Sequence, residues 1–318
     1  MPPTFCRHNR FVQNCAICRA PDPPPAERKR SARAAATRTR AGSSASSART
    51  GAVRVRRVTQ AADDGFRCEL VSGLKASADA ERLAGELAFS AARLAELAAE
   101  PPGVYAEIGA EPDAEEALWL AFLTAYLAPV EDGPDAFAGI RAAHVPWASG
   151  ELPDLDVARG PRTSHDRAAG ARAVTAYRAW AQRAGGQARA FAGEAAWTPQ
   201  RRFDRVFERL ALPGFGRPGR YELLVSLGRL GVADVLPSSL NLTDDATTLA
   251  AKRVFGIGDK LLLERRAREL ADASELPIEA LDLALFNWAA PAGGRATMGS
   301  RAVARDEERD AIAAVLGL

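Results

Sequence analysis

Apolar residues recur at three- and four-residue spacing from about residue 66 onward, which is the spacing of one face of an α-helix. The pattern predicts helices over residues 76–100, 113–127, 135–142, 168–185, 199–210, 217–230, 245–254, 259–272, 277–290 and 305–316. Strand patterns are nearly absent, because 53–58 is too basic and isolated for a core strand and 66–71 is the only other candidate. The expected fold is therefore an all-α body over residues 59–318.

The segment 21–58 differs in composition from this body. It is rich in Pro, Ser, Ala and Arg, and it lacks the large apolar residues whose burial offsets the entropy lost on ordering. We therefore expect a disordered, Arg-rich linker there.

Charge changes the picture, because the net charge of +2 hides an asymmetry. Residues 1–60 hold 13 Lys and Arg against 2 Asp and Glu, a net of +11, so that residues 61–318 carry −9. A basic arm on an acidic body is typical of a protein that binds a polyanion, and DNA is the expected partner.

The chain shows no sign of membrane association. It has no run of about 18 apolar residues, and its N-terminus lacks the apolar segment of a secretory signal. We expect a cytoplasmic, nucleoid-associated monomer.

Three of the four cysteines and one of the three histidines lie close together near the N-terminus. These candidate metal ligands are Cys6, His8, Cys15 and Cys18. Two close pairs separated by a short loop suit a tetrahedral Zn²⁺, so residues 1–20 are predicted to form a zinc knuckle. Four protein ligands close the site, which makes zinc a structural cofactor that supplies folding energy. The alternative is an accidental cluster in a disordered tail. Cys68 stands alone and is expected to be a buried thiol.

Residues 201–230 contain the most informative motif. An amphipathic helix is followed by the sequence LPGFGR at 212–217 and then by a second helix. This order is typical of a helix-hairpin-helix, in which glycines allow a tight reversal and leave backbone N–H groups free to face a DNA phosphate. The residues expected to contact DNA are Leu212, Gly214, Phe215, Gly216, Arg217 and Arg220. An ordinary Gly-Pro turn between two helices is the alternative.

The residues that follow resemble the helix-hairpin-helix DNA glycosylase superfamily, in which a catalytic aspartate downstream of the hairpin begins a helix. The segment 243–256, TDDATTLAAKRVFG, looks like that helix. Residues 276–289 resemble the closing core helix of the superfamily and 117–127 its first long core helix, so the resemblance covers roughly residues 110–292.

Within the superfamily, residues 250–256 and 281–288 are most similar to the alpha-glutamyl/putrescinyl thymine pyrophosphorylase group and to the helical partner domain of 5-hydroxymethyluracil DNA kinases. Two features depart from the superfamily pattern. Asp245 follows Gly216 by 29 residues, which is longer than usual, so an insertion is expected at about 231–243. Residues 217–220 contain no lysine where bifunctional members carry their nucleophile, so no lyase step is expected.

The resemblance implies a catalytic carboxylate at Asp245, with Asp244 as the fallback. A carboxylate can stabilise positive charge developing on a sugar or deprotonate an attacking water. The alternative is that these aspartates only cap the helix. Asp234 is a third candidate, and Asp282, between apolar residues on a helix, is expected to be a buried partner.

A base extruded from the DNA stack needs a pocket with apolar or aromatic walls and a few polar groups. The aromatic residues available are Trp119, Tyr126, Trp147, Trp180 and Trp288, although aromatics at helical spacing more often belong to a core. His144 and His165 lie in predicted loops, where each could contact a base or phosphate or simply be solvated.

Together these features favour a monofunctional DNA glycosylase that hydrolyses the N-glycosidic bond of a modified pyrimidine after base extrusion, the base being 5-hydroxymethyluracil or a hypermodified thymine. The second hypothesis is a DNA base-hypermodification enzyme on the same fold, which rebuilds the base without releasing it. The third is a non-catalytic, zinc-containing DNA-binding adaptor.

Overall fold

A computed structural model of the protein describes residues 61–318, so the zinc-knuckle and linker predictions for 1–20 and 21–58 lie outside the described residues. The helices are α1 (Ser77–Ala99), α2 (Val104–Ala110), α3 (Ala114–Leu127), α4 (Ala138–Ala143), α5 (Arg172–Ala184), α6 (Gln187–Ala192), α7 (Pro199–Arg209), α8 (Arg217–Arg229), α9 (Ala246–Phe255), α10 (Lys260–Ala273), α11 (Ala280–Ala289) and α12 (Asp306–Val315), with 3₁₀ turns η2 (Trp147–Ser149) and η3 (Arg167–Ala169). Residues 61–318 contain no β-strand, which confirms the all-α prediction for this part of the chain.

The differences from the predicted elements have local causes. Helices α2 and α6 were not predicted, because they are only 7 and 6 residues long and present no repeated apolar face. The candidate strand at 66–71 instead leads into a turn. Cys68 is half-buried against the core, not fully buried as expected.

Helix ends follow the capping residues in the sequence. The side chain of Thr198 accepts a hydrogen bond from the backbone N–H of Arg201 at 3.2 Å, and Pro199 occupies the first position of α7. Helix α9 ends at Gly256, which has the left-handed conformation (φ 66°) that glycine adopts without strain.

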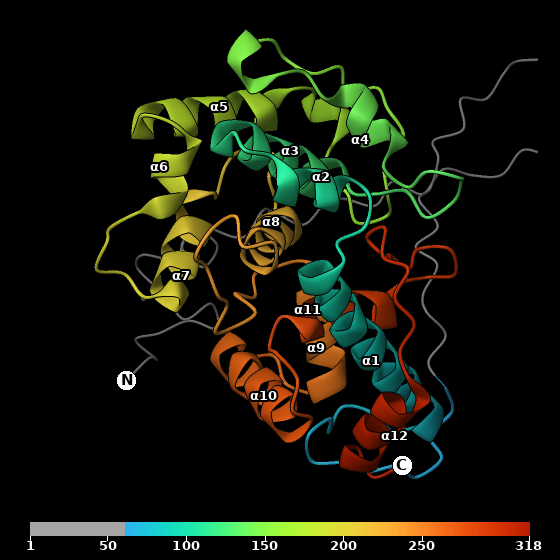
Figure 1. The fold of residues 1–318 in the computed structure, drawn as a ribbon. Helices are drawn as coiled ribbons and strands as arrows, with labels where there is room; N and C mark the ends of the chain where they lie inside the picture. The colour runs from blue at the N-terminus through green and yellow to red at the C-terminus, as the bar shows by residue number, and fades with distance from the viewer. Residues whose placement is uncertain (1–60) are drawn as a thin grey trace, which may run out of the picture. The chain divides into compact units, whose positions relative to one another are not determined.

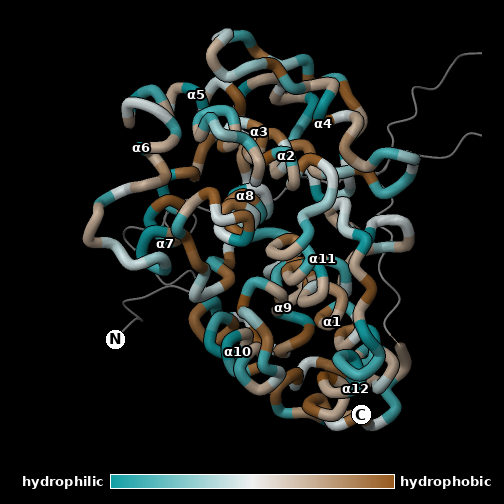
Figure 2. Tube along the Cα trace, viewed as in Figure 1, coloured by the Kyte–Doolittle hydropathy of each residue, from teal (hydrophilic) through white to brown (hydrophobic). Residues whose placement is uncertain are grey.

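The helices form two groups, as Figure 1 shows. Helix α1 packs against α11 and α12, and α9 packs against α11 and α10. In the other group α3 packs against α8, α2 and α6, and α5 packs against α6. Apolar colouring in Figure 2 concentrates on helices such as α3 and α11, whereas the exposed faces of α10 and α12 are hydrophilic.

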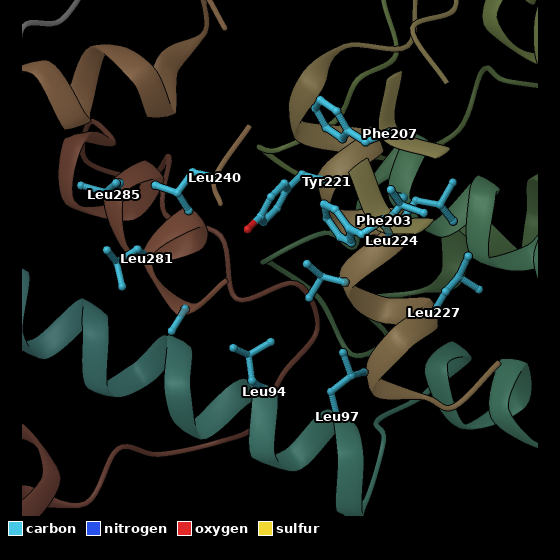
Figure 3. Close-up of a cluster of buried hydrophobic side chains, with 14 of the residues drawn as sticks. Leu94, Leu97, Phe203, Phe207, Tyr221, Leu224, Leu227, Leu240, Leu281 and Leu285 are labelled. Atoms are coloured by element: carbon cyan, nitrogen blue, oxygen red, sulfur yellow. The ribbon is translucent and has the colours of Figure 1, made fainter. Parts of the chain in front are cut away.

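The two groups share one hydrophobic core, which continues across their junction between α8 and α1. Figure 3 shows side chains of α1, α7, α8 and α11 converging there. In this view the Tyr221 ring lies between the side chains of Leu240 and Phe203. The Tyr221 ring meets Phe203 edge-on at 5.4 Å, and its hydroxyl donates to Ser239 O at 3.0 Å. Within residues 61–318, no helix has both the length and the apolarity needed to cross a bilayer.

Residues 160–164, which precede η3, are held against the C-terminal end of α3 by a close contact between the two backbones. The N–H of Gly160 donates to Ala128 O at 2.9 Å, and that of Ser164 donates to Tyr126 O at 2.9 Å. A Cβ atom at residue 160 would lie 1.8 Å from Pro129 O, so only glycine allows this approach.

We expect Gly160→Ala to lower the free energy of unfolding by about 2–3 kcal/mol, because the backbone must move away from Pro129. Urea unfolding followed by helical circular dichroism measures it. Gly85→Ala is the matched control: it lies inside α1 with no atom within 4 Å of an added Cβ, and should stabilise by about 0.5–1 kcal/mol. Equal free energies of unfolding for the two variants would contradict the close approach of the backbone at residue 160 to Pro129.

Candidate functional site

The hairpin between α7 and α8 is a tight turn. The N–H of Phe215 donates to Leu212 O at 3.0 Å, with Pro213 next and Gly214 at φ 81°, as a type II turn requires. Gly214 and Gly216 are exposed, so the backbone of this turn is open to solvent. Leu212 is half-buried against the core.

The side chain of Phe215 points inward, where it contributes to packing and not to a DNA-facing surface. It is 2% exposed, and its ring lies 5.0 Å from Phe122 and 6.2 Å from Tyr126 of α3. The hairpin is therefore tied to α3 through an aromatic contact.

Arg217 also points inward, unlike the surface contact expected from the sequence. Its side chain is 1% exposed, and its Nη2 donates to Leu240 O at 2.5 Å. The guanidinium lies 4.8 Å from the centre of the Tyr221 ring. Arg220 is half-buried, with Nη1 donating to Phe207 O at 3.0 Å. Neither arginine is a free surface cation.

A buried ion pair at Asp282 joins α11 to two other parts of the chain. One carboxylate oxygen pairs with Arg162, which lies in the segment before η3, and the other lies 2.7 Å from Nη2 of Arg217 at the start of α8. All three side chains are at most 3% exposed. Burial alone would raise the pKa of Asp282, but the charges of Arg162 and Arg217 hold it below its ordinary value.

Glu222 of α8 continues this network on the other side of Arg162. Its Oε2 lies 3.3 Å from Arg162 Nη1, while its Oε1 pairs with Arg93 of α1 and accepts a hydrogen bond from the Tyr105 hydroxyl at 3.3 Å. Burial, together with the charge of Glu222, raises the pKa of Tyr105, so the phenol stays protonated and donates.

At its outer end the network reaches Asp245, whose Oδ2 lies 3.2 Å from Arg217 Nη1. The complete series alternates in sign and runs Arg93, Glu222, Arg162, Asp282, Arg217, Asp245. Three cations balance three anions, which keeps each buried charge compensated. The Asp245 side chain is 12% exposed against 1% for Arg217, so the network meets solvent at Asp245.

The two candidate catalytic aspartates have different environments. Asp245 caps α9, because its Oδ1 accepts hydrogen bonds from the N–H and the hydroxyl of Thr248 at 2.8 and 2.7 Å. Asp244 is 85% exposed and lies 3.7 Å from Lys260 Nζ. Of the two aspartates, Asp245 both caps α9 and contacts the buried charge network, whereas Asp244 does neither.

The other sequence candidates lie elsewhere. Asp234 pairs with Arg202 at one side of a cavity of about 410 Å³ lined by apolar residues of α6 and its surroundings. His144 Nε2 lies 2.6 Å from Glu116, which ties the loop after α4 to α3. Trp147 is half-buried, whereas Trp119, Tyr126, Trp180 and Trp288 belong to the core. Within residues 61–318, no cluster of three or more His, Cys, Asp or Glu could hold a metal ion.

Arg93, Arg162 and Glu222 were not singled out from the sequence. A signal was present for Glu222, which sits beside Leu223 and Leu224 in an apolar helix just as Asp282 sits among apolar residues in α11. A charged residue on an apolar helix face needs a buried partner of opposite sign. The partners come from distant segments, and sequence spacing gives no sign of them.

Comparison with protein families gives one match. Residues 161–291 resemble the family described as alpha-glutamyl/putrescinyl thymine pyrophosphorylase, clade 3. The matched segment includes the hairpin and the network residues Arg162, Arg217, Asp245 and Asp282. It is the narrower of the two resemblances described from the sequence, and membership of the glycosylase superfamily does not follow from it. Neither a curated protein nor a solved structure matches the chain.

Asp282→Asn should lower the free energy of unfolding at pH 7 by about 3–5 kcal/mol, because Arg162 and Arg217 lose a buried counter-charge. Denaturant unfolding measures this loss. The exposed Asp244→Asn is the matched control, with a change within about 0.5 kcal/mol.

The pH dependence follows from the lowered pKa of Asp282, whose ordinary value is 3.8. The ionised carboxylate stabilises the native state above that value, and this stabilisation disappears as the pH falls through the lower pKa of the folded state. Wild-type stability should therefore fall below pH 3.8 more steeply than that of Asp282→Asn. Parallel acid unfolding profiles would contradict the assignment.

Proposed function

We propose that the protein is a DNA base-modifying enzyme that changes a substituent of a thymine-type base, with pyrophosphate as the group that leaves or attacks, while the base stays on its sugar. The observation that carries this proposal is the match of residues 161–291 to a thymine pyrophosphorylase family. The hairpin and the charge network both lie inside the matched segment.

The family description joins a thymine, an α-glutamyl or putrescinyl group, and pyrophosphate. In the step we infer, an amine nitrogen attacks the exocyclic carbon of the base and forms a C–N bond. The C–O bond to the diphosphate breaks, and its electron pair leaves with pyrophosphate. The attacking nitrogen then loses a proton to a base, so that atoms and electrons balance.

Asp245 is the residue we assign to proton acceptance. It is the network member that meets solvent, and its position is fixed by the helix cap and by Arg217. The developing charge on the leaving pyrophosphate would be met by the positive end of the α8 dipole, beside the exposed Gly216.

DNA is the partner that this function requires. The exposed face of α7 carries Arg201, Arg205 and Arg209 at four-residue spacing, next to the open backbone of the hairpin. Because Arg217 points inward, we assign phosphate contacts to the turn backbone and to this arginine face.

A DNA glycosylase is the second candidate, favoured by a carboxylate at the start of the helix that follows the hairpin. The contacts of Asp245, with Thr248 on one oxygen and Arg217 on the other, are the same for both candidates and do not separate them. The family description names a thymine pyrophosphorylase and not a glycosylase, and therefore supports the first candidate.

Mass spectrometry of nucleosides from DNA that carries a diphosphate ester on the exocyclic carbon of thymine distinguishes these functions. With glutamate or putrescine present, the wild type should yield an amine-substituted nucleoside and free pyrophosphate, without abasic sites. Free base with abasic sites would establish the glycosylase instead. Binding without any chemical change would establish the adaptor.

Asp245→Asn should reduce this activity by about 10²–10⁴-fold, the usual effect of a proton-transfer group, because asparagine still caps α9 but cannot accept the proton. Initial rates from the same nucleoside assay measure it. Asp244→Asn is the matched control and should stay within about twofold of the wild type, because it is an exposed surface residue. Equal rates for both variants would remove Asp245 from the mechanism.

We also propose that Cys6, His8, Cys15 and Cys18 bind a structural zinc ion. Elemental analysis of the purified chain should give about one equivalent of zinc, and Cys15→Ser with Cys18→Ser should remove it. Cys68→Ser is the control and should retain the metal. Less than about half an equivalent in the wild type would contradict the site.

A further inference from the structure

A second cavity lies beside the hairpin, between residues 153–156 and 165–171. Its volume is about 390 Å³. This volume falls within the range of small-molecule sites, about 300–1,000 Å³, although the depression is shallow and open to solvent. Its apolar wall includes Pro153 and Leu155, both buried, and its polar lining includes Asp154, Asp156, His165 and Arg167. An apolar wall with a few polar groups suits a small planar ligand.

Two contacts place this cavity next to the hairpin. A Cβ atom at Gly214 would lie 3.3 Å from the Cβ of Ala173, two residues after Ala171 in the cavity wall. One at Gly219 in the first turn of α8 would lie 2.4 Å from Ser164 Oγ, the neighbour of His165. Residues adjacent in the sequence to the cavity lining therefore lie against the hairpin turn and the first turn of α8.

Tyr126 is the hydrogen-bond partner of His165 Nδ1. The Tyr126 hydroxyl lies 2.8 Å from His165 Nδ1. Within residues 61–318, this nitrogen is the one hydrogen-bond partner of the hydroxyl. Burial raises the pKa of Tyr126 to about 12, so this hydroxyl keeps its hydrogen and can donate it to an unprotonated Nδ1, which is the arrangement adopted here. The proton of the neutral imidazole is then on Nε2, which leaves an N–H donor for the cavity.

The surroundings also keep His165 neutral. Burial lowers its pKa, and the nearby charges of Arg159 and Arg167 lower it further, while Asp166 opposes them. Of the cavity carboxylates, Asp156 is already paired with Arg167 at 2.9 Å, and Asp154 is exposed. The cavity thus offers a neutral N–H donor, a carboxylate acceptor and an apolar wall.

We propose that this cavity holds the pyrimidine ring of the substrate, with His165 Nε2–H donating to a ring carbonyl oxygen and Pro153 and Leu155 contacting the ring. This assignment rests on the proposed function, because an enzyme that modifies a base within DNA must hold that base in a pocket. A pyrimidine of the thymine type has the carbonyl oxygens that accept from His165 and an N–H that a carboxylate such as Asp154 accepts.

Nitrogen NMR of the full-length chain labelled with ¹⁵N-histidine tests this directly, because the chain has only three histidines. At pH 7 His165 should be the Nε2–H tautomer, and thymidine at millimolar concentration should shift its Nε2 resonance. His144, which pairs with Glu116 outside the cavity, is the internal control and should not shift. In Tyr126→Phe, the His165 pKa should rise and the tautomer preference should weaken.

Equilibrium dialysis with thymidine gives an independent readout. His165→Phe removes the donor and should weaken binding about tenfold, as expected for one lost hydrogen bond. His165→Gln keeps a donor and should restore part of the affinity, and His144→Gln should bind as the wild type does. The proposal is overturned if thymidine leaves His165 unchanged, or if only glutamate or putrescine shifts it. Thymidine binding without any base modification of DNA would refute the proposed function and leave the pocket assignment standing.

Discussion

The ion pair between Arg162 and Asp282 is the interaction on which the rest of the structure depends. It lies at the middle of a buried series of alternating charges that ends at Arg93 inside and at Asp245 outside. Removing one member would leave its neighbour charged and without a partner in a low-dielectric interior, which costs several kcal/mol. The pair therefore requires α1, α8, α11, the start of α9 and the segment before η3 to keep fixed relative positions. Hydrophobic contacts across the same junction, seen in Figure 3, tolerate more variation because they are not directional.

This constraint also explains why the large side chains of the hairpin point into the protein. Its arginine at 217 is needed inside, where it joins Asp282 to Asp245, and Phe215 is needed against α3. What remains at the surface is the backbone at Gly214 and Gly216, supported from beneath by charged and aromatic side chains. Under the proposed function, phosphate contacts made by this backbone would carry no sequence information.

Asp245 and His165 are held in place to different degrees. Asp245 has both carboxylate oxygens engaged, so its position is fixed by tertiary contacts as well as by its own helix. His165 is oriented by one hydroxyl from α3 and lines a cavity formed by loops. The proposed reaction on a base would use both groups, a carboxylate held in place and an imidazole held by a hydrogen bond.

The sequence by itself determined the longer helices, because apolar spacing and caps such as Thr198 and Asp245 act within a few residues, whereas the short α2 and α6 were not predicted. It also predicted the hairpin turn at Gly214 and the burial of Asp282. Tertiary structure decided which way Arg217 points, which partners neutralise Asp282, and that Tyr126 orients His165. These outcomes rest on pairs such as Arg162 with Asp282, 120 residues apart in the chain. Local propensity carries no information about such pairs, since they form only when packed helices bring the charges within a few ångströms of each other.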